Sequence, residues 1–309
     1  MLAQSSTVEH FLAAADFRQR FSFGGVSVEL RADSPDDAHG GDELLAFQAA
    51  AGDSTRAEID IEVLWADELH AEPTQESFDS GALWRVFDLA GESLFEFASP
   101  LLGRNPYKEL RADSDFRNVK VILSRAAGER CGKISPLEYP ACELVMTNYL
   151  ARHRLGVEVH GCGLIDRDTG CHLFLGHSGA GKSTTARMWE TFRAPEILSD
   201  DRIILRLHDG QLWMYGTPWH GEAAFASPNS AKINRIHILR HGRENKLSML
   251  PQARAVGEVF ARCFPPFYSA SGLAGAVDFI KSAIAVVPCY EFNFRPDRTS
   301  VSAVLSFHD

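Results

Sequence analysis

Alternation of apolar and polar residues predicts strands along the first part of the chain. A period of two residues indicates a strand with one buried face. Five segments have this pattern or a short apolar run: 21–31, 57–65, 82–89, 93–98 and 117–124. The intervening stretch 32–55 is rich in glycine, serine and aspartate, so we expect an exposed excursion there. The pattern predicts a β-rich N-terminal domain over residues 1–135, which contains no catalytic motif.

The pattern then becomes helical and afterwards alternates between strands and helices. Proline suits the first turn of a helix and glycine suits its end, so Pro140 and Gly156 bound the first predicted helix. An alternating order of strands and helices predicts an α/β domain over residues 136–309. The further predicted elements are a hairpin over 157–175, a helix over 182–193, a hairpin over 200–216, helices near 253–260 and 273–284, and a strand over 289–295.

Composition is that of an ordinary globular protein, with 309 residues of which 45% are hydrophobic and 23% charged. No apolar stretch approaches the roughly 20 residues of a membrane span. Residues 1–20 lack the apolar centre of a secretion signal. The six cysteines include no pair at the spacing of a metal or redox motif, which favours reduced thiols. We therefore expect a cytoplasmic protein without a membrane partner.

Charge is distributed unevenly within a net charge of -10. Residues 1–150 carry 26 acidic and 13 basic side chains, whereas residues 151–309 carry 15 acidic and 18 basic ones. Nucleic-acid-binding proteins usually concentrate basic residues on one face or in one run, and no such run exists here. We expect no nucleic-acid partner. The second half therefore repels a polyanionic ligand less than the first half does.

The second half contains a glycine-rich loop that matches the phosphate-binding P-loop pattern G-x-x-x-x-G-K-[ST]. It reads GHSGAGKS over residues 176–183, and it lies between a predicted strand and a predicted helix. Glycines allow the backbone to turn with positive φ and to approach phosphate oxygens, while a lysine and a hydroxyl contact the phosphates and Mg²⁺. We expect ATP or another purine nucleotide to contact Gly176, His177, Ser178, Gly179, Ala180, Gly181, Lys182, Ser183 and Thr184.

Two adjacent aspartates follow the P-loop at a distance that suits one helix and one strand. Asp200 and Asp201 come 18 and 19 residues after Lys182, in the segment EILSDDRIIL. Side chains alternate along a regular strand, so both carboxylates reach one site only if the strand breaks there. One carboxylate is then expected to hold Mg²⁺ and the other to accept a proton from an incoming hydroxyl. Positioning and charge neutralisation by Lys182 and Mg²⁺ supply most of the expected acceleration.

These features, in this order, resemble the C-terminal domain of the HPr serine kinase/phosphorylase family and its HPr-kinase-like relatives. The resemblance covers roughly residues 140–309 and rests on VEVHGCGLI, GHSGAGKST, ILSDDR and the following hairpin. It implies a mixed sheet flanked by helices, with ATP and Mg²⁺ as ligands. It also implies Asp200 as the catalytic base, Asp201 as a metal-side carboxylate, and His160 near the reacting phosphate.

The sequence departs from that family after the acidic pair. The Glu-Arg-Gly signature of HPr kinases is missing, and the corresponding stretch is GTPWHGE, residues 216–222. Its Trp219, His220 and Glu222 are expected either to contact substrate or nucleotide or, for Trp219, to pack at the rim. The departure argues against HPr itself as substrate. Such relatives imply transfer to a serine of another protein, a peptide or a free amino acid, with a homo-oligomer left open.

Two other readings compete with a serine kinase. Small-metabolite kinases of the shikimate type share the P-loop and an acidic motif at similar spacing. They continue into a helix, however, whereas IILRLHDGQLWMYG predicts a hairpin. A P-loop NTPase that acts as a nucleotide switch would have a strand ending in a carboxylate followed by glutamate. The sequence Asp-Asp-Arg fits that pattern poorly.

Overall fold

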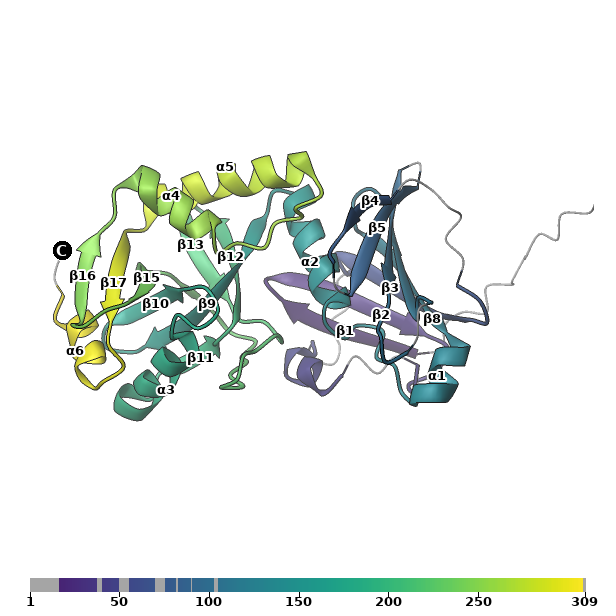
Figure 1. The fold of residues 1–309 in the computed structure, drawn as a ribbon, viewed down its shortest axis with the longest axis horizontal. Coiled ribbons are helices and arrows are strands. Elements are labelled where there is room, and N and C mark those ends of the chain that lie inside the picture. Colours follow the sequence, from purple (N-terminus) through teal and green to yellow (C-terminus); the bar gives the residue numbers. More distant parts are fainter. Residues whose placement is uncertain are drawn as a thin grey trace, which may run out of the picture.

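A computed structural model describes residues 17–37, 41–49, 56–69, 76–81, 83–89, 91–102 and 105–307. The chain forms two sheets that follow one another in the sequence and lie side by side, with helix α2 (Ala141–Arg152) between them (Figure 1). Each sheet mixes parallel and antiparallel neighbours and has helices packed against it, so the protein is of the α/β class.

The first sheet has eight strands in the order β1-β2-β3-β8-β7-β6-β5-β4. Its two parallel pairings are β2 with β3 and β3 with β8, and its other neighbours are antiparallel. The strands are β1 (Phe17–Phe23), β2 (Val26–Ala32), β3 (Ile59–Ala66), β4 (Glu76–Asp79), β5 (Trp84–Leu89), β6 (Glu92–Phe97), β7 (Lys108–Ala112) and β8 (Asn118–Ser124).

Two predictions for this half are wrong. Residues 21–31 form parts of two strands rather than one, because Gly24 and Gly25 adopt φ of 62° and 67° and turn the chain back on itself. The stretch 32–55 is not simply exposed. Its described part contains the 3₁₀ helix η1 (Asp42–Phe47), whose Leu44 and Phe47 are buried in the core. The predicted strands near 57–65, 82–89, 93–98 and 117–124 are confirmed, whereas β4, β7 and helix α1 (Arg125–Cys131) were not predicted.

The second sheet has nine strands in the order β14-β13-β12-β9-β10-β15-β17-β16, with β11 paired to β9. Both predicted hairpins, β9 with β10 and β12 with β13, are confirmed, and so is the last strand, β17. The strands are β9 (Gly156–Asp166), β10 (Gly170–Leu175), β11 (Glu196–Ser199), β12 (Arg202–His208), β13 (Gln211–Tyr215), β14 (Ser230–Lys232), β15 (Arg235–His241), β16 (Lys246–Met249) and β17 (Cys289–Phe294).

Helices cover both faces of the second sheet (Figure 1). Helices α4 (Gln252–Phe260) and α5 (Ala270–Val286) bury Val259, Ala276 and Ile280 against one face. Helices α3 (Lys182–Arg193) and α6 (Thr299–Leu305) bury Trp189 and Val301 against the other. The predicted helices α2, α3, α4 and α5 are confirmed, and α6 was not predicted. This three-layer arrangement holds the end of β10 and the start of α3 close together at one edge of the second sheet, and the P-loop runs between them.

The two sheets share part of one hydrophobic core. Helix α2 packs its apolar residues into the core of the first sheet, and Ile204 and Trp219 from the second half join the same cluster. At the tip of the β1–β2 hairpin, Arg206 donates from Nη1 to the carbonyl oxygens of Gly24 at 3.0 Å and Gly25 at 2.6 Å. The domain boundary at residues 135/136 stays a prediction, and α2 contacts both halves.

All six cysteines are free, and four of them are buried. In the part of the chain that the structure describes, no helix combines the length and the apolarity needed to cross a membrane.

A buried histidine pair connects the strand that leads into the P-loop with its neighbour β15. His172 on β10 and His237 on β15 are 1% and 0% exposed, and the His172 Nδ1 to His237 Nε2 distance is 3.2 Å. Burial, helped by the positive charge of Arg235 and opposed by Asp166, lowers the pKa of His172 to about 4. Burial and the two neighbouring groups His172 and Arg235 lower the pKa of His237 well below its usual value.

We predict that this pair makes the free energy of unfolding fall as the pH drops below about 6.5. Between pH 6.5 and 4 the unfolded chain binds a proton at His172 that the folded chain does not, so acid favours unfolding. One such histidine should remove about 2 kcal/mol by pH 5. Urea unfolding at pH 7.5 and pH 5 measures this loss. In His172→Phe the loss should shrink, and an equal loss in both proteins would contradict the assignment.

Candidate active site

The glycine-rich loop connects the end of β10 to the start of α3. Gly179 and Gly181 adopt φ of 77° and 103°, as predicted for a loop that turns its amides inward. Gly176 does not have positive φ, so the prediction for this glycine is wrong. Glycine is needed there for another reason: a Cβ at Gly176 would lie 2.6 Å from the Cβ of Ala180. The helix dipole of α3 points its positive end at this loop.

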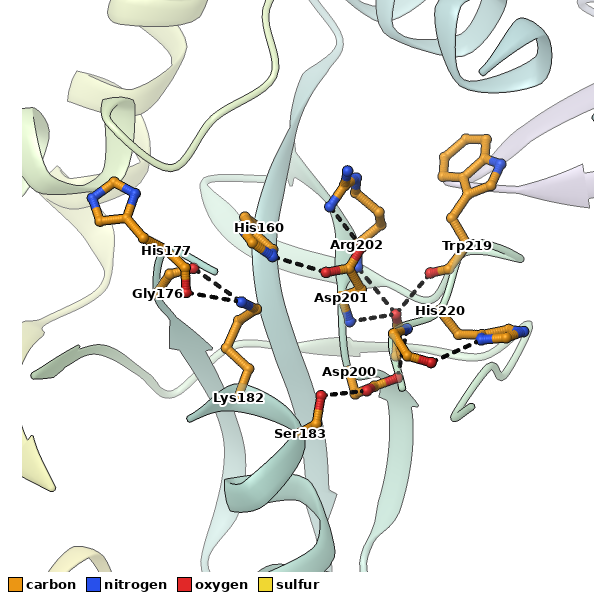
Figure 2. Close-up of polar contacts among 12 residues, drawn as sticks. His160, Gly176, His177, Lys182, Ser183, Asp200, Asp201, Arg202, Trp219 and His220 are labelled. Atoms are coloured by element: carbon orange, nitrogen blue, oxygen red, sulfur yellow. Dashed lines mark hydrogen bonds and ion pairs between the residues drawn. The ribbon is translucent and has the colours of Figure 1, made fainter. Parts of the chain in front are cut away.

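Lys182 folds back over the loop. Its Nζ donates to the carbonyl oxygens of Gly176 at 3.1 Å and His177 at 3.2 Å (Figure 2). The side chain is buried, and this burial lowers its pKa to about 8 although Asp201 favours the charged form. Lys182 thus brings a positive charge to the loop, and two carbonyl oxygens of the loop accept hydrogen bonds from it. Around this centre His177, Ser178 and Thr184 are exposed.

Asp200 lies beneath the first turn of α3. Its Oδ2 accepts a hydrogen bond from Ser183 Oγ at 2.7 Å (Figure 2). Three backbone amides of the loop after β13 also donate to its two oxygens, those of Gly221 at 3.0 Å, Ala223 at 3.1 Å and Phe225 at 3.4 Å. The residue is 1% exposed. Its four donors match the roughly four acceptor sites of a carboxylate, so Asp200 is fully engaged.

Asp201 faces a different set of groups, because the strand breaks between β11 and β12. Ser199 Oγ accepts from the amides of Asp201 and Arg202 at this break, which turns the two carboxylates apart. The Oδ1 of Asp201 lies 2.8 Å from His160 Nε2, and its Oδ2 accepts from Arg202 at 2.7 Å (Figure 2). Burial opposes ionisation of Asp201, but the hydrogen bond from His160 and the charge of Arg202 outweigh it and lower the pKa.

His160 reaches this position because β9 changes neighbours there. Arg202 pairs with His160 across β12 and β9, and from Gly163 onwards β9 pairs with β11 on that side, while β10 lies on its other side. The carbonyl of His160 accepts from the amide of Gly176, so the histidine is tied to the start of the P-loop. The side chains of His160 and Asp201 are 17% and 26% exposed, so they are accessible where Asp200 is not.

Arg202 is a site residue that the sequence analysis missed. Its Nε lies 2.8 Å from Glu143 Oε1 on α2 and 3.1 Å from Glu158 Oε1 on β9. Burial and the neighbouring Glu143 raise the pKa of Glu158 well above its usual value, although Arg202 opposes them. Arg202 therefore links α2 and β9 to Asp201. The signal was an arginine directly after the acidic pair, together with a glutamate inside the apolar helix after Pro140.

In the loop 216–222, the packing alternative holds for Trp219, and substrate contact by His220 and Glu222 stays a prediction. Trp219 is 6% exposed and packs edge-on against Phe23 of β1, with ring centroids 5.7 Å apart. Its side chain belongs to the shared core and is not at the site. His220 and Glu222 are exposed, and the loop reaches the site through its backbone amides to Asp200. A Cβ at Gly221 would lie 2.7 Å from Asp200 Oδ2, so glycine permits this approach.

The oxygens beside the P-loop suit a magnesium ion. Mg²⁺ prefers oxygen ligands and in nucleotide sites takes one or two from the protein with others from phosphates and water. Ser183 Oγ is an oxygen of this kind, and Asp200 accepts its hydrogen bond at 2.7 Å. Among the described residues no cluster of three or more histidine, cysteine, aspartate or glutamate side chains is arranged to hold a metal.

Comparison with known proteins gives a distant structural relationship. No protein-family model and no curated protein matches the chain. Among solved structures, the HPr(Ser) kinase/phosphatase from Coxiella burnetii is similar to it at 12% identity and a TM-score of 0.27, over 48% of this chain and 93% of that chain. At these values the likeness is a distant structural relationship and carries no argument about mechanism or substrate.

Proposed function

We propose that this chain is an ATP-dependent kinase that transfers the γ-phosphate to a hydroxyl group of a serine-containing protein, peptide or amino acid. One observation carries the proposal. A P-loop lysine and serine lie beside two carboxylates that point to different partners, Asp200 to Ser183 and Asp201 to His160. Phosphoryl transfer to a hydroxyl needs both a metal-side oxygen and a proton acceptor.

The contacts favour the opposite roles for the two aspartates from those that the family resemblance implies. Asp200 is buried and bonded to Ser183, the hydroxyl expected to contact Mg²⁺, and its lone pairs are occupied by four donors. Asp201 is more accessible and has a histidine within hydrogen-bond distance. We therefore assign Asp200 to the metal side and Asp201, with His160 orienting it, to the base.

The chemical step follows from these roles. The acceptor hydroxyl gives its proton to Asp201 as its oxygen forms a bond to the γ-phosphorus, and the bond from that phosphorus to the bridging oxygen of ADP breaks in line. Lys182 and the inward-facing amides of the P-loop neutralise the charge on the transferred group. A magnesium ion held by Ser183, whose hydroxyl Asp200 orients through their hydrogen bond, would supply further charge neutralisation.

The fold supports the same proposal at a coarser level. A strand, a phosphate loop and a helix follow one another, which is the arrangement that the sequence motif requires, and the acidic pair comes directly after β11, which β9 separates from β10. We propose that residues 136–309 form a P-loop domain of the HPr-kinase type and that residues 1–135 form a separate unit. The hairpin of β12 and β13 stands where a small-metabolite kinase of the shikimate type would have a helix.

Incubation of the purified chain with γ-labelled ATP and Mg²⁺ tests the proposal. We expect label in acid-stable phosphoserine when host lysate or free serine is added, and no label with the double variant Lys182→Ala/Asp201→Asn. Comparison of lysate with free serine separates macromolecular from amino-acid acceptors. Label released only as inorganic phosphate, with no acceptor labelled, would overturn the kinase proposal in favour of a nucleotide switch.

A further inference from the structure

A cavity opens between the two halves of the chain, next to the proposed base. Its volume is about 240 Å³, and it is lined by residues that precede or begin β5, by the start of α2 and by the segment 264–268 that leads into α5. In Figure 1 these three elements meet at α2, where β4 and β5 face the second sheet. Pockets that enclose a whole drug-sized ligand measure roughly 300–1,000 Å³. This cavity therefore suits one side group of a larger molecule.

The lining is apolar, and much of its rim is exposed. Leu83, Tyr139 and Phe267 are 41%, 51% and 57% exposed. They account for three of the eight exposed large hydrophobic residues in the part of the chain that the structure describes. Exposed apolar residues scattered singly need no explanation, but a group of them around a cavity indicates a contact with another molecule.

The walls of the cavity are held in place by aromatic packing. The rings of Trp84 and Tyr268 meet edge to face with centroids 6.2 Å apart, and Trp84 also packs against the buried Phe95. The hydroxyl of Tyr268 donates to the side-chain oxygen of Asn148 on α2. The cavity is thus built from both halves and does not depend on a single loop.

The inner end of the cavity is formed by residues that hold the proposed base. The guanidinium carbon of Arg202 lies 4.0 Å from the ring centroid of Phe264, and the rings of Phe264 and His160 are 5.8 Å apart. Glu143, the one charged residue of the lining, is ion-paired with Arg202. A group seated in the cavity therefore lies against Phe264 and Glu143, which both contact Arg202, the partner of Asp201.

We infer that this cavity binds a bulky apolar side chain of the phosphoryl acceptor, and that the acceptor is a peptide segment whose serine lies a few residues from that side chain. The inference rests on the proposed function and names its substrate class. A free amino acid has no group to span Arg202 and Phe264, whereas an extended peptide advances about 3.3 Å per residue. An acidic side chain would meet Glu143 and an apolar wall, so the cavity excludes it.

Peptide selection in the absence of transfer tests the inference. The purified full chain, with Mg²⁺ and a non-hydrolysable ATP analogue, is mixed with acetylated peptides that carry a fixed serine and degenerate flanking positions. The peptides that stay bound to the protein are identified by mass spectrometry. We expect phenylalanine, tryptophan, leucine or isoleucine to be enriched about tenfold or more over aspartate and glutamate at one position. Equal retention of apolar and acidic peptides would overturn the inference.

Rim variants show whether the selection comes from this cavity. Leu83→Ser and Phe267→Ser replace exposed side chains, so the fold should survive, and each should reduce the enrichment severalfold. Met249→Ser, 62% exposed on β16, is the matched control and should leave it unchanged. An unchanged preference in both rim variants would contradict the inference. Selection of apolar peptides without any labelling by ATP would support the proposed role of the cavity and overturn the proposed kinase activity. Labelling by ATP without a preference for apolar peptides would support the kinase activity and overturn the role of the cavity.

Discussion

The variant Asp201→Asn should transfer phosphate about 10² to 10⁴ times more slowly than the native chain, which is the usual contribution of a general base. Asparagine keeps the size of the side chain and can still accept the hydrogen bond at 2.8 Å from His160, but it cannot take up the proton of the acceptor hydroxyl. Nucleotide affinity should change little, because Asp201 does not contact Ser183 or the loop amides. Single-turnover transfer and equilibrium binding of a fluorescent ATP analogue separate the two effects.

Asp200→Asn provides the matched comparison within the acidic pair. We expect it to raise the Mg²⁺ concentration needed for half-maximal activity, because Asp200 accepts a hydrogen bond at 2.7 Å from Ser183, the hydroxyl proposed to bind Mg²⁺. Asp278→Asn, exposed on α5, controls for the loss of one charge. If Asp201→Asn transferred phosphate normally and Asp200→Asn did not, the roles would be those that the family resemblance implies.

Lys182→Ala should weaken ATP binding roughly 10- to 100-fold, because a hydrogen bond to a charged group is worth about 1.5–3 kcal/mol. Transfer should fall by about a further 10² to 10³, the usual loss when one donor to a developing charge is removed. The pH dependence gives a second readout. The pKa of Lys182 is about 8 in the free protein, so above that pH its neutral amine must take up a proton when nucleotide binds. The affinity of the native chain for ATP should then fall by up to tenfold per pH unit above pH 8, and that of Lys182→Ala should show no such fall.

Lys182→Arg and Lys281→Ala complete this experiment. Arginine keeps its charge at all accessible pH values, so the affinity of Lys182→Arg should stay flat above pH 8 even if it is weaker. Lys281 is exposed on α5, and its replacement should leave both affinity and pH profile unchanged. A native profile that does not change between pH 7 and pH 9.5 would contradict the charge assigned to Lys182.

Local signals in the sequence predicted much of the second half of the fold. The hairpin turning at Asp209–Gly210, the helix after Lys182 and the strand after Pro288 all follow from short-range preferences for turns, helix starts and alternation. The hairpin at Gly24–Gly25 was missed because apolar alternation continues across both strands. Strands β15 and β16 were missed because their pairing with β10 and β17 is set by residues far away in the sequence.

The candidate site divides in the same way. The spacing of Lys182, Ser183, Asp200 and Asp201 predicted that these residues belong to one site, since it depends only on one helix and one strand. The spacing could not predict what each carboxylate contacts, because the amides around Asp200 come from the loop after β13 and Arg202 is fixed by Glu143 on α2. For Trp219 the sequence left substrate contact and packing open for the same reason, since its partner Phe23 lies in the first strand of the chain.

The tip of the β1–β2 hairpin constrains how this sequence can change over generations. A Cβ at Gly25 would lie 2.6 Å from Arg206 Nη1 and 3.1 Å from Tyr215, at a φ of +67° that disfavours other residues. A larger residue at position 25 would therefore have to displace the end of the Arg206 side chain, and the positive φ would strain it even then. The same change would remove the bonds that join the hairpin to β12. Position 25 should thus stay glycine wherever Arg206 makes these bonds, and a half taken from a divergent relative that lacks either residue should fit poorly against the other.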